Sequence, residues 1–116
     1  MSKPDDCPIA LEPYTVALIA EENAEAIQMT GKWGRFGPDH ARRDGMTARR
    51  GLSLELGDVL AAIDFGLCAG LIDLDIMLKQ RDYKFSRLTD PNALDDEGRR
   101  LAPILPSHGD RLVIHG

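Results

Sequence analysis

The sequence predicts an all-α fold, in which antiparallel helices pack into a bundle. Apolar residues recur every three or four positions through three segments, at about residues 8–30, 47–69 and 74–88. Aromatic residues make up only 5% of the chain and apolar residues 43%, which suits a core built on Leu, Ile and Ala. With 116 residues, we expect one domain with a helical core over about 8–89 and an irregular tail over 90–116.

The first helix is expected to begin at Pro8 or Pro13, because proline is favoured in the first turn, where a backbone N–H has no helical partner. Gly31 is expected to end this helix, since glycine commonly follows the last turn. Residues 31–47 contain four glycines and a proline, so they predict a connecting loop.

The second and third helices have recognisable capping residues. Thr47 is the expected N-cap of the second helix, which should stop at Gly70. Within that helix, Gly57 is expected to permit the close approach of a neighbouring helix. Asp73 is the expected N-cap of the third helix, over residues 74–88.

The composition narrows the classes of partner. A formal net charge of −5 argues against nucleic acid as a partner, because binding a phosphate backbone generally requires a basic surface. The N-terminal segment has no long apolar run and no stretch approaches a membrane span, so we expect a cytoplasmic protein without a membrane partner. Cys7 and Cys68 lie in unrelated contexts without CxxC spacing, which favours two free thiols over a disulfide.

Four carboxylates interrupt the apolar stripes of the first two helices. Glu22 and Glu25 are three residues apart, as are Glu55 and Asp58, so each pair shares one helix face. Acids that point inward from two helices repel each other and lose hydration unless protons or a cation compensate. Because the set lacks Cys and His, it favours Mg²⁺, with Mn²⁺ as a substitute, over zinc. The alternative is that these acids are solvated on helix surfaces.

A locally basic segment lies between the two acidic pairs. Residues 31–50 hold six cations against two acids in an otherwise acidic chain, so we expect this segment to attract phosphate groups. Lys32 and Arg35 are the candidate phosphate ligands there, Trp33 is a candidate to stack on a base, and Phe36 is expected to pack in the core. The alternative is a solvated loop whose aromatic residues close the end of the bundle. Further cations lie late in the third helix, where the candidate phosphate ligands are Arg81, Lys84 and Arg87.

The order of these motifs resembles that of a known family. The segment EENAE at residues 21–25, followed by ELGD at residues 55–58, is similar to the EExxE…ExxD signature of the MazG-like, all-α nucleoside triphosphate pyrophosphohydrolases. The segments KWGRFG, ELGDVLAAIDFG and YKFSR fit the same pattern. The resemblance covers about residues 14–88.

The resemblance implies a single MazG-like helical domain, a half-bundle completed by a homodimer or homotetramer. It also implies an enzyme that cleaves a nucleoside triphosphate between the α and β phosphates, giving the monophosphate and pyrophosphate. In the family pattern the four acids would be the Mg²⁺ ligands, and Lys84 and Arg87 would hold the phosphates. One of the four acids, or Glu21 beside them, would accept the proton of the attacking water.

Two departures from the family pattern bear on activity. Leu54 stands where many members have another Glu, and the 29 residues between Glu25 and Glu55 make a longer connection than usual. Leu54 motivates the alternative of a non-catalytic helical adaptor that kept the fold and binds a nucleotide or a partner helix. Two more alternatives are a purely structural bundle and a close relative within the class that hydrolyses phosphoribosyl-ATP.

Overall fold

The computed structural model describes residues 10–90, 92 and 97–99. These residues form three helices and, apart from one isolated β-bridge, no strand, so the all-α prediction is confirmed. The helices are α1 (Leu11–Phe36), α2 (Ala48–Cys68) and α3 (Leu74–Leu88). α1 and α2 belong to one compact unit, which extends to Ile72, and α3 belongs to a second. Pro8, Cys7 and almost all of the predicted tail lie outside the described residues.

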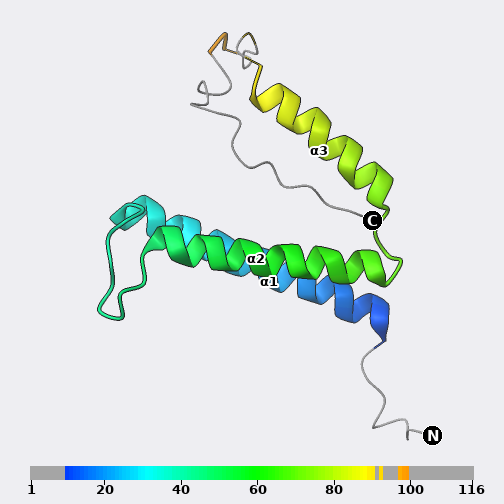
Figure 1. Ribbon diagram of the computed structural model, residues 1–116, viewed down its shortest axis with the longest axis horizontal. Coiled ribbons are helices and arrows are strands. Elements are labelled where there is room, and N and C mark those ends of the chain that lie inside the picture. Colours follow the sequence, from blue (N-terminus) through cyan, green and yellow to red (C-terminus); the bar gives the residue numbers. More distant parts are fainter. Residues whose placement is uncertain (1–9, 91, 93–96, 100–116) are drawn as a thin grey trace, which may run out of the picture. The chain divides into compact units, whose positions relative to one another are not determined.

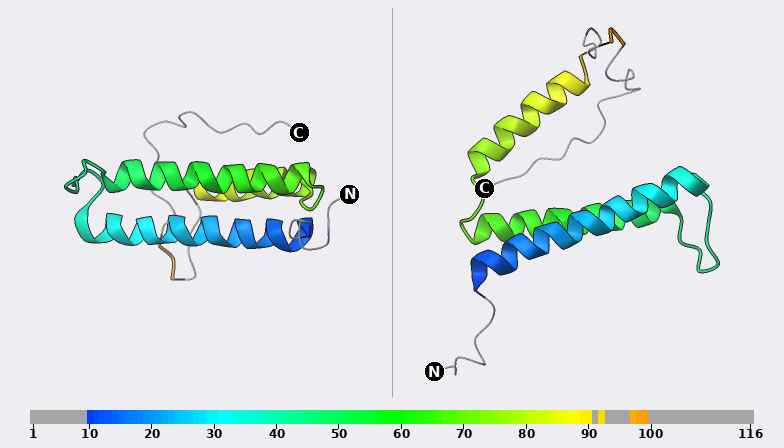
Figure 2. Two further views of the ribbon diagram at one scale, coloured as in Figure 1. Left: turned by 90° about the horizontal axis from the view of Figure 1, so that it is seen from below. Right: turned by 180° about the vertical axis from the view of Figure 1, so that it is seen from behind.

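α1 and α2 form an antiparallel hairpin (Figures 1 and 2). At one end the ring of Tyr14 meets that of Phe65 edge-on, with 5.7 Å between the ring centroids. At the other end Met29 packs directly on Gly51. These two contacts fix the register of the helices, so the residues between them on α1 and α2 are brought face to face.

Small residues line the interface between α1 and α2. The buried residues of the two helices are Thr15, Ala26, Ala48, Gly51, Ala62 and Gly66. Thr15 is only 1% exposed, and its hydroxyl donates to the Leu11 carbonyl at 2.6 Å. A Cβ on Gly66 would stand 2.5 Å from Cδ1 of Ile72 and 3.5 Å from Cγ2 of Thr15. The backbones therefore approach closely, and side chains beside the interface can reach the opposite helix.

The predicted N-caps are confirmed. The Thr47 hydroxyl accepts the backbone N–H of Arg50 at 3.1 Å, and the Asp73 carboxylate accepts the N–H of Ile76 at 3.0 Å. Each bond satisfies a donor that has no partner within the first turn of its helix. The predicted stop of α2 is also confirmed, because Gly70 adopts a left-handed conformation with φ of 75° just after the helix.

The predicted end of α1 at Gly31 is wrong, because the helix continues to Phe36. The first left-handed residue is Gly37, with φ of 83°, and its N–H donates to the Trp33 carbonyl at 2.8 Å. Glycine inside a helix costs about 1 kcal/mol relative to alanine, which a contact with another helix can outweigh. Such a contact is present, since the Arg49 guanidinium of α2 lies 5.5 Å from the centroid of the Trp33 ring.

The prediction that Gly57 permits the close approach of a neighbouring helix is wrong. No atom lies within 4 Å of the point where a Cβ on Gly57 would stand, whereas Gly51 and Gly66 do pack against side chains. We expect Gly57→Ala to raise the free energy of unfolding by about 0.5–1 kcal/mol, because alanine is the better helix former. Urea unfolding measures the change. Gly66→Ala is the matched control and should give no such gain, because Ile72 must shift to admit the methyl group; equal gains from both variants would contradict this account.

α3 presents one half-buried face, as the spacing of its residues predicted. The residues on that face are Leu74, Leu78, Arg81 and Phe85.

Across the described part of the chain, no helix combines the length and the apolar character needed to span a membrane.

Candidate metal centre

Four carboxylates meet between the two ends of the α1–α2 hairpin, and we call them the acidic quartet: Glu22, Glu25, Glu55 and Asp58. One oxygen from each lies within 4.8 Å of the others. Glu25 and Glu55 lie one helical turn from the contact between Met29 and Gly51, which brings them opposite each other. The predicted pairs on α1 and α2 are therefore brought together into one cluster.

Burial divides the acidic quartet. Glu22 and Glu55 are half-buried, whereas Glu25 and Asp58 are exposed, so the predicted inward position holds for one acid of each pair. The Oε2 atoms of Glu22 and Glu55 are buried and have no hydrogen-bond partner among the described residues. A buried carboxylate oxygen without a donor is unfavourable unless a proton or a cation compensates for its charge.

The pKa values of the half-buried acids respond to this environment. Burial raises the pKa of Glu22, and repulsion from the rest of the acidic quartet and from Glu21 raises it further. Burial also raises the pKa of Glu55, as do repulsion from Glu25 and a hydrogen bond that these two acids share when one is protonated. Lys32 is close enough to act in the opposite direction on the pKa of Glu55. The acidic quartet thus favours any positive charge, whether proton or metal ion.

The donor set of the acidic quartet fits a hard divalent cation. Four carboxylates provide oxygen ligands alone, which suits Mg²⁺ or Mn²⁺ and leaves coordination positions for water and phosphate oxygens. Zinc more often takes nitrogen and sulfur ligands. Glu21 is exposed and lies outside the cluster, as does Leu54, which is 49% exposed.

The loop at residues 37–47 is held by two pairs of charged residues. Arg49 donates to both carboxylate oxygens of Asp39, at 2.8 and 3.1 Å, and Arg42 likewise engages Asp44. The hydrogen bonds from these arginines lower the pKa values of both aspartates. Two of the six cations predicted to attract phosphate are therefore used to shape the loop.

The other predicted cations of this segment form no ion pair within the described part of the chain: Lys32, Arg35, Arg43 and Arg50. The Arg35 guanidinium lies 5.4 Å from the centroid of the Phe36 ring. Phe36 is 58% exposed, so the prediction that it packs in the core is wrong. The reason is the extended helix, whose last turn places the Phe36 ring beside the loop and the start of α2. Trp33, the predicted base-stacking residue, is half-buried, and the Arg49 guanidinium lies over its ring.

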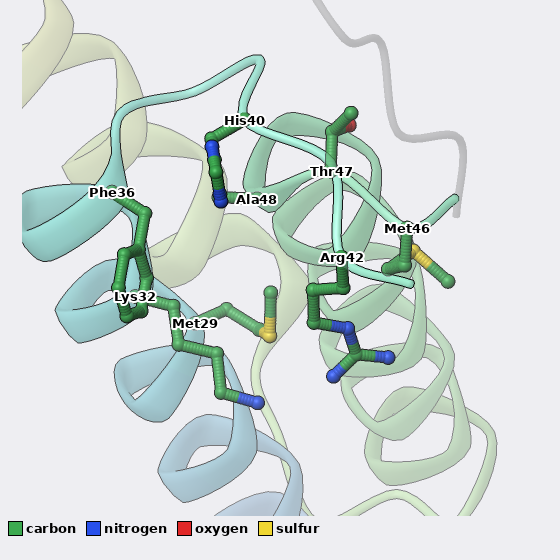
Figure 3. Close-up of a pocket in the computed structure, with 8 residues that line it drawn as sticks. All are labelled: Met29, Lys32, Phe36, His40, Arg42, Met46, Thr47 and Ala48. Carbon is green, nitrogen blue, oxygen red and sulfur yellow. The ribbon is translucent and has the colours of Figure 1, made fainter. Parts of the chain in front are cut away.

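A pocket of about 240 Å³ lies at the loop end of the hairpin (Figure 3). Its lining residues are Met29, Lys32, Phe36, His40, Arg42, Met46, Thr47 and Ala48. The rings of Phe36 and His40 stack at an interplanar angle of 25°, with 5.8 Å between their centroids. Local sequence patterns do not predict this pocket, because it requires both the extension of α1 and the fold of the loop.

The predicted phosphate ligands of the third helix lie on α3, which belongs to the second compact unit. Lys84 and Arg87 line a pocket of about 250 Å³ together with Tyr83, whose hydroxyl accepts a hydrogen bond from Arg87 at 3.4 Å. Arg81 pairs with the neighbouring Asp82 at 3.2 Å.

No protein-family model matches the chain, and neither a curated protein nor a solved structure matches it.

Proposed function

We propose that the protein is a magnesium-dependent nucleoside triphosphate pyrophosphohydrolase that converts a (d)NTP to the (d)NMP and pyrophosphate. The observation that carries this proposal is the convergence of four carboxylates from two helices, with oxygens within 4.8 Å of one another. Two of these acids have buried oxygens that lack a donor among the described residues, which favours a cation over solvated surface acids. The resemblance of the acidic motifs to the MazG-like signature supports the same activity.

The reaction adds water to the α-phosphorus and breaks the bond from that phosphorus to the bridging oxygen of the β-phosphate. A bound Mg²⁺ would screen the phosphate charges and lower the pKa of the attacking water. The acidic quartet would hold the ion, and one of its members or Glu21 would accept the proton of the water. Basic residues would neutralise the charge that develops on the departing pyrophosphate. On the hairpin, the candidate for this role is Arg35, which forms no ion pair within the described part of the chain.

Incubation with a panel of nucleoside triphosphates in H₂¹⁸O, with Mg²⁺ or Mn²⁺, tests this proposal. We expect pyrophosphate release that stops on chelation of the metal, with ¹⁸O in the monophosphate, because water attacks the α-phosphorus. Label in pyrophosphate would instead mean attack at the β-phosphorus. Nucleotide binding without turnover would favour the non-catalytic adaptor, and hydrolysis of phosphoribosyl-ATP alone would reassign the substrate.

We also propose that a second copy completes the hairpin, in a homodimer or homotetramer. Large apolar side chains on α1 and α2 are between 47% and 68% exposed: Leu11, Val16, Ile27, Leu54 and Leu56. The small residues between the helices bury little apolar area, so association offers the hairpin further burial. Light scattering measures the oligomeric state; a monomer at micromolar concentration would contradict this part of the proposal.

A further inference from the structure

We propose that the pocket at the loop end of the hairpin binds the nucleoside part of the substrate, with the base against Phe36 and His40 and the sugar directed toward the acidic quartet. This inference rests on the proposed function and deepens it, because it assigns a place to the part of the nucleotide that does not react. It concerns residues of α1, the loop and the start of α2 alone.

Position is the first argument for this assignment. Cleavage between the α and β phosphates requires the α-phosphate at the metal, and the nucleoside is joined to that phosphorus through a single oxygen. The nucleoside must therefore lie immediately beside the acidic quartet. Met29, which lines the pocket, is four residues after Glu25 on α1, a rise of about 6 Å along the helix.

Lys32 joins the pocket to the acidic quartet. It lines the pocket, and its charge also reaches Glu55. Within the described residues Lys32 forms no ion pair, whereas the Arg42 guanidinium is already held by Asp44. Lys32 is therefore the cation of this pocket that can bind the phosphate nearest the sugar.

The chemistry of the lining fits a flat, partly polar ring. In Figure 3 the thioether of Met29 lies between the charged ends of Lys32 and Arg42 on one side and the rings of Phe36 and His40 on the other. Exposed aromatic faces stack on bases, and methionine adapts its shape to a flat ligand. The volume of about 240 Å³ lies below the range of about 300–1,000 Å³ typical of sites for whole drug-sized ligands. It therefore suits a base with its sugar, while the phosphates extend out of the pocket.

The first test compares the nucleotide substrate with inorganic tripolyphosphate, an inhibitor that has no nucleoside. We expect Phe36→Ala to raise KM for the preferred nucleoside triphosphate about 10-fold with little change in kcat. The reason is that stacking on Phe36 stabilises the bound substrate and the transition state equally. Inhibition by inorganic tripolyphosphate should stay unchanged in the same variant. Phe36→Tyr, which keeps the aromatic face, should retain the wild-type KM, and Phe36→Leu should not. Equal losses of affinity for nucleotide and tripolyphosphate would overturn the assignment.

The second test does not depend on turnover. With methyl-¹³C-methionine, the signals of Met29 and Met46 report on the pocket, and a nucleoside 5′-monophosphate is the probe, without metal. We expect both signals to shift saturably in the wild type, and Phe36→Ala should need about 10 times more nucleotide to reach half of the shift. Pyrophosphate release without these shifts would overturn the pocket assignment and leave the proposed function standing. If both methionine signals shift but no nucleotide gives pyrophosphate, the proposed function is overturned and the pocket assignment stands.

Discussion

Glu55→Gln is expected to lower kcat/KM for Mg²⁺-dependent pyrophosphate release by about 100-fold or more. The substitution keeps the size of the half-buried side chain but removes the negative charge from one of the four converging acids. Loss of residues that merely support a metal ligand costs about 10–100-fold, so loss of a ligand itself should cost at least as much. Initial rates of pyrophosphate release at saturating Mg²⁺ measure the effect, with circular dichroism to verify that the helices remain folded.

Glu12→Gln is the matched control for this loss. Glu12 lies in the first turn of the same helix as Glu25 but outside the acidic quartet, so its neutralisation should leave the rate within about twofold of the wild type, as is usual for surface changes away from a site. Asp58→Asn should match Glu55→Gln, and the double variant should be little worse than either single one, because the acids act as a unit. Full activity in both single variants would exclude the acidic quartet from catalysis.

Without a divalent metal, the protein is expected to become more stable as the pH falls from 7 toward 5. The pKa values of Glu22 and Glu55 are raised above the ordinary value of a glutamate, so the folded state binds protons more tightly than the unfolded state. Their repulsion therefore destabilises the fold as the pH rises through these pKa values. Asp39 and Asp44 act in the opposite sense, because their pKa values are lowered below 3.8 and their stabilisation is lost only in stronger acid. The two effects together predict a maximum of stability at mildly acidic pH. Thermal melts in EDTA between pH 3 and pH 8 test this prediction.

Mg²⁺ should oppose this loss of stability at neutral pH. At a metal concentration 100 times its dissociation constant, binding to the folded state alone adds about 2.7 kcal/mol to the free energy of unfolding. The gain should be smaller at pH 5, where protons compete for the acidic quartet. Glu22→Gln should be more stable than the wild type in EDTA and should gain less from Mg²⁺. A melting temperature that Mg²⁺ does not change at any pH would favour solvated acids and a structural bundle.

The parts of the fold that local chemistry determines were predictable from the sequence. The caps at Thr47 and Asp73 depend on hydrogen bonds that span three residues, so the sequence around each cap is sufficient to predict it. The acidic pairs were predictable for the same reason, since a spacing of three residues places side chains on one helix face. That the two faces meet depends on the register of the helices, and this is fixed by the packing of Met29 on Gly51.

The pocket could not be predicted, because it depends on contacts between distant residues. Arg49 binds Asp39, ten positions earlier, and also covers Trp33 of α1. These contacts let α1 continue past a glycine that, judged by local preference, should have ended it. They also explain why Phe36 lines a pocket beside the loop when its apolar character predicted a place in the core.

The last turns of α1 have a further consequence for local unfolding. Gly31 and Gly34 have open space where side chains would stand, so neither adds a packing contact to these turns, which the contact of Trp33 with Arg49 holds against α2. Segments with few packing contacts open at a lower free energy than the protein as a whole, and their amide hydrogens exchange faster. The helix can therefore fray back from Phe36 while the middle of α1, packed through the buried Ala26, stays closed. A ligand can then reach the pocket through a brief opening of one helix end while the acidic quartet, further along the hairpin, stays in place.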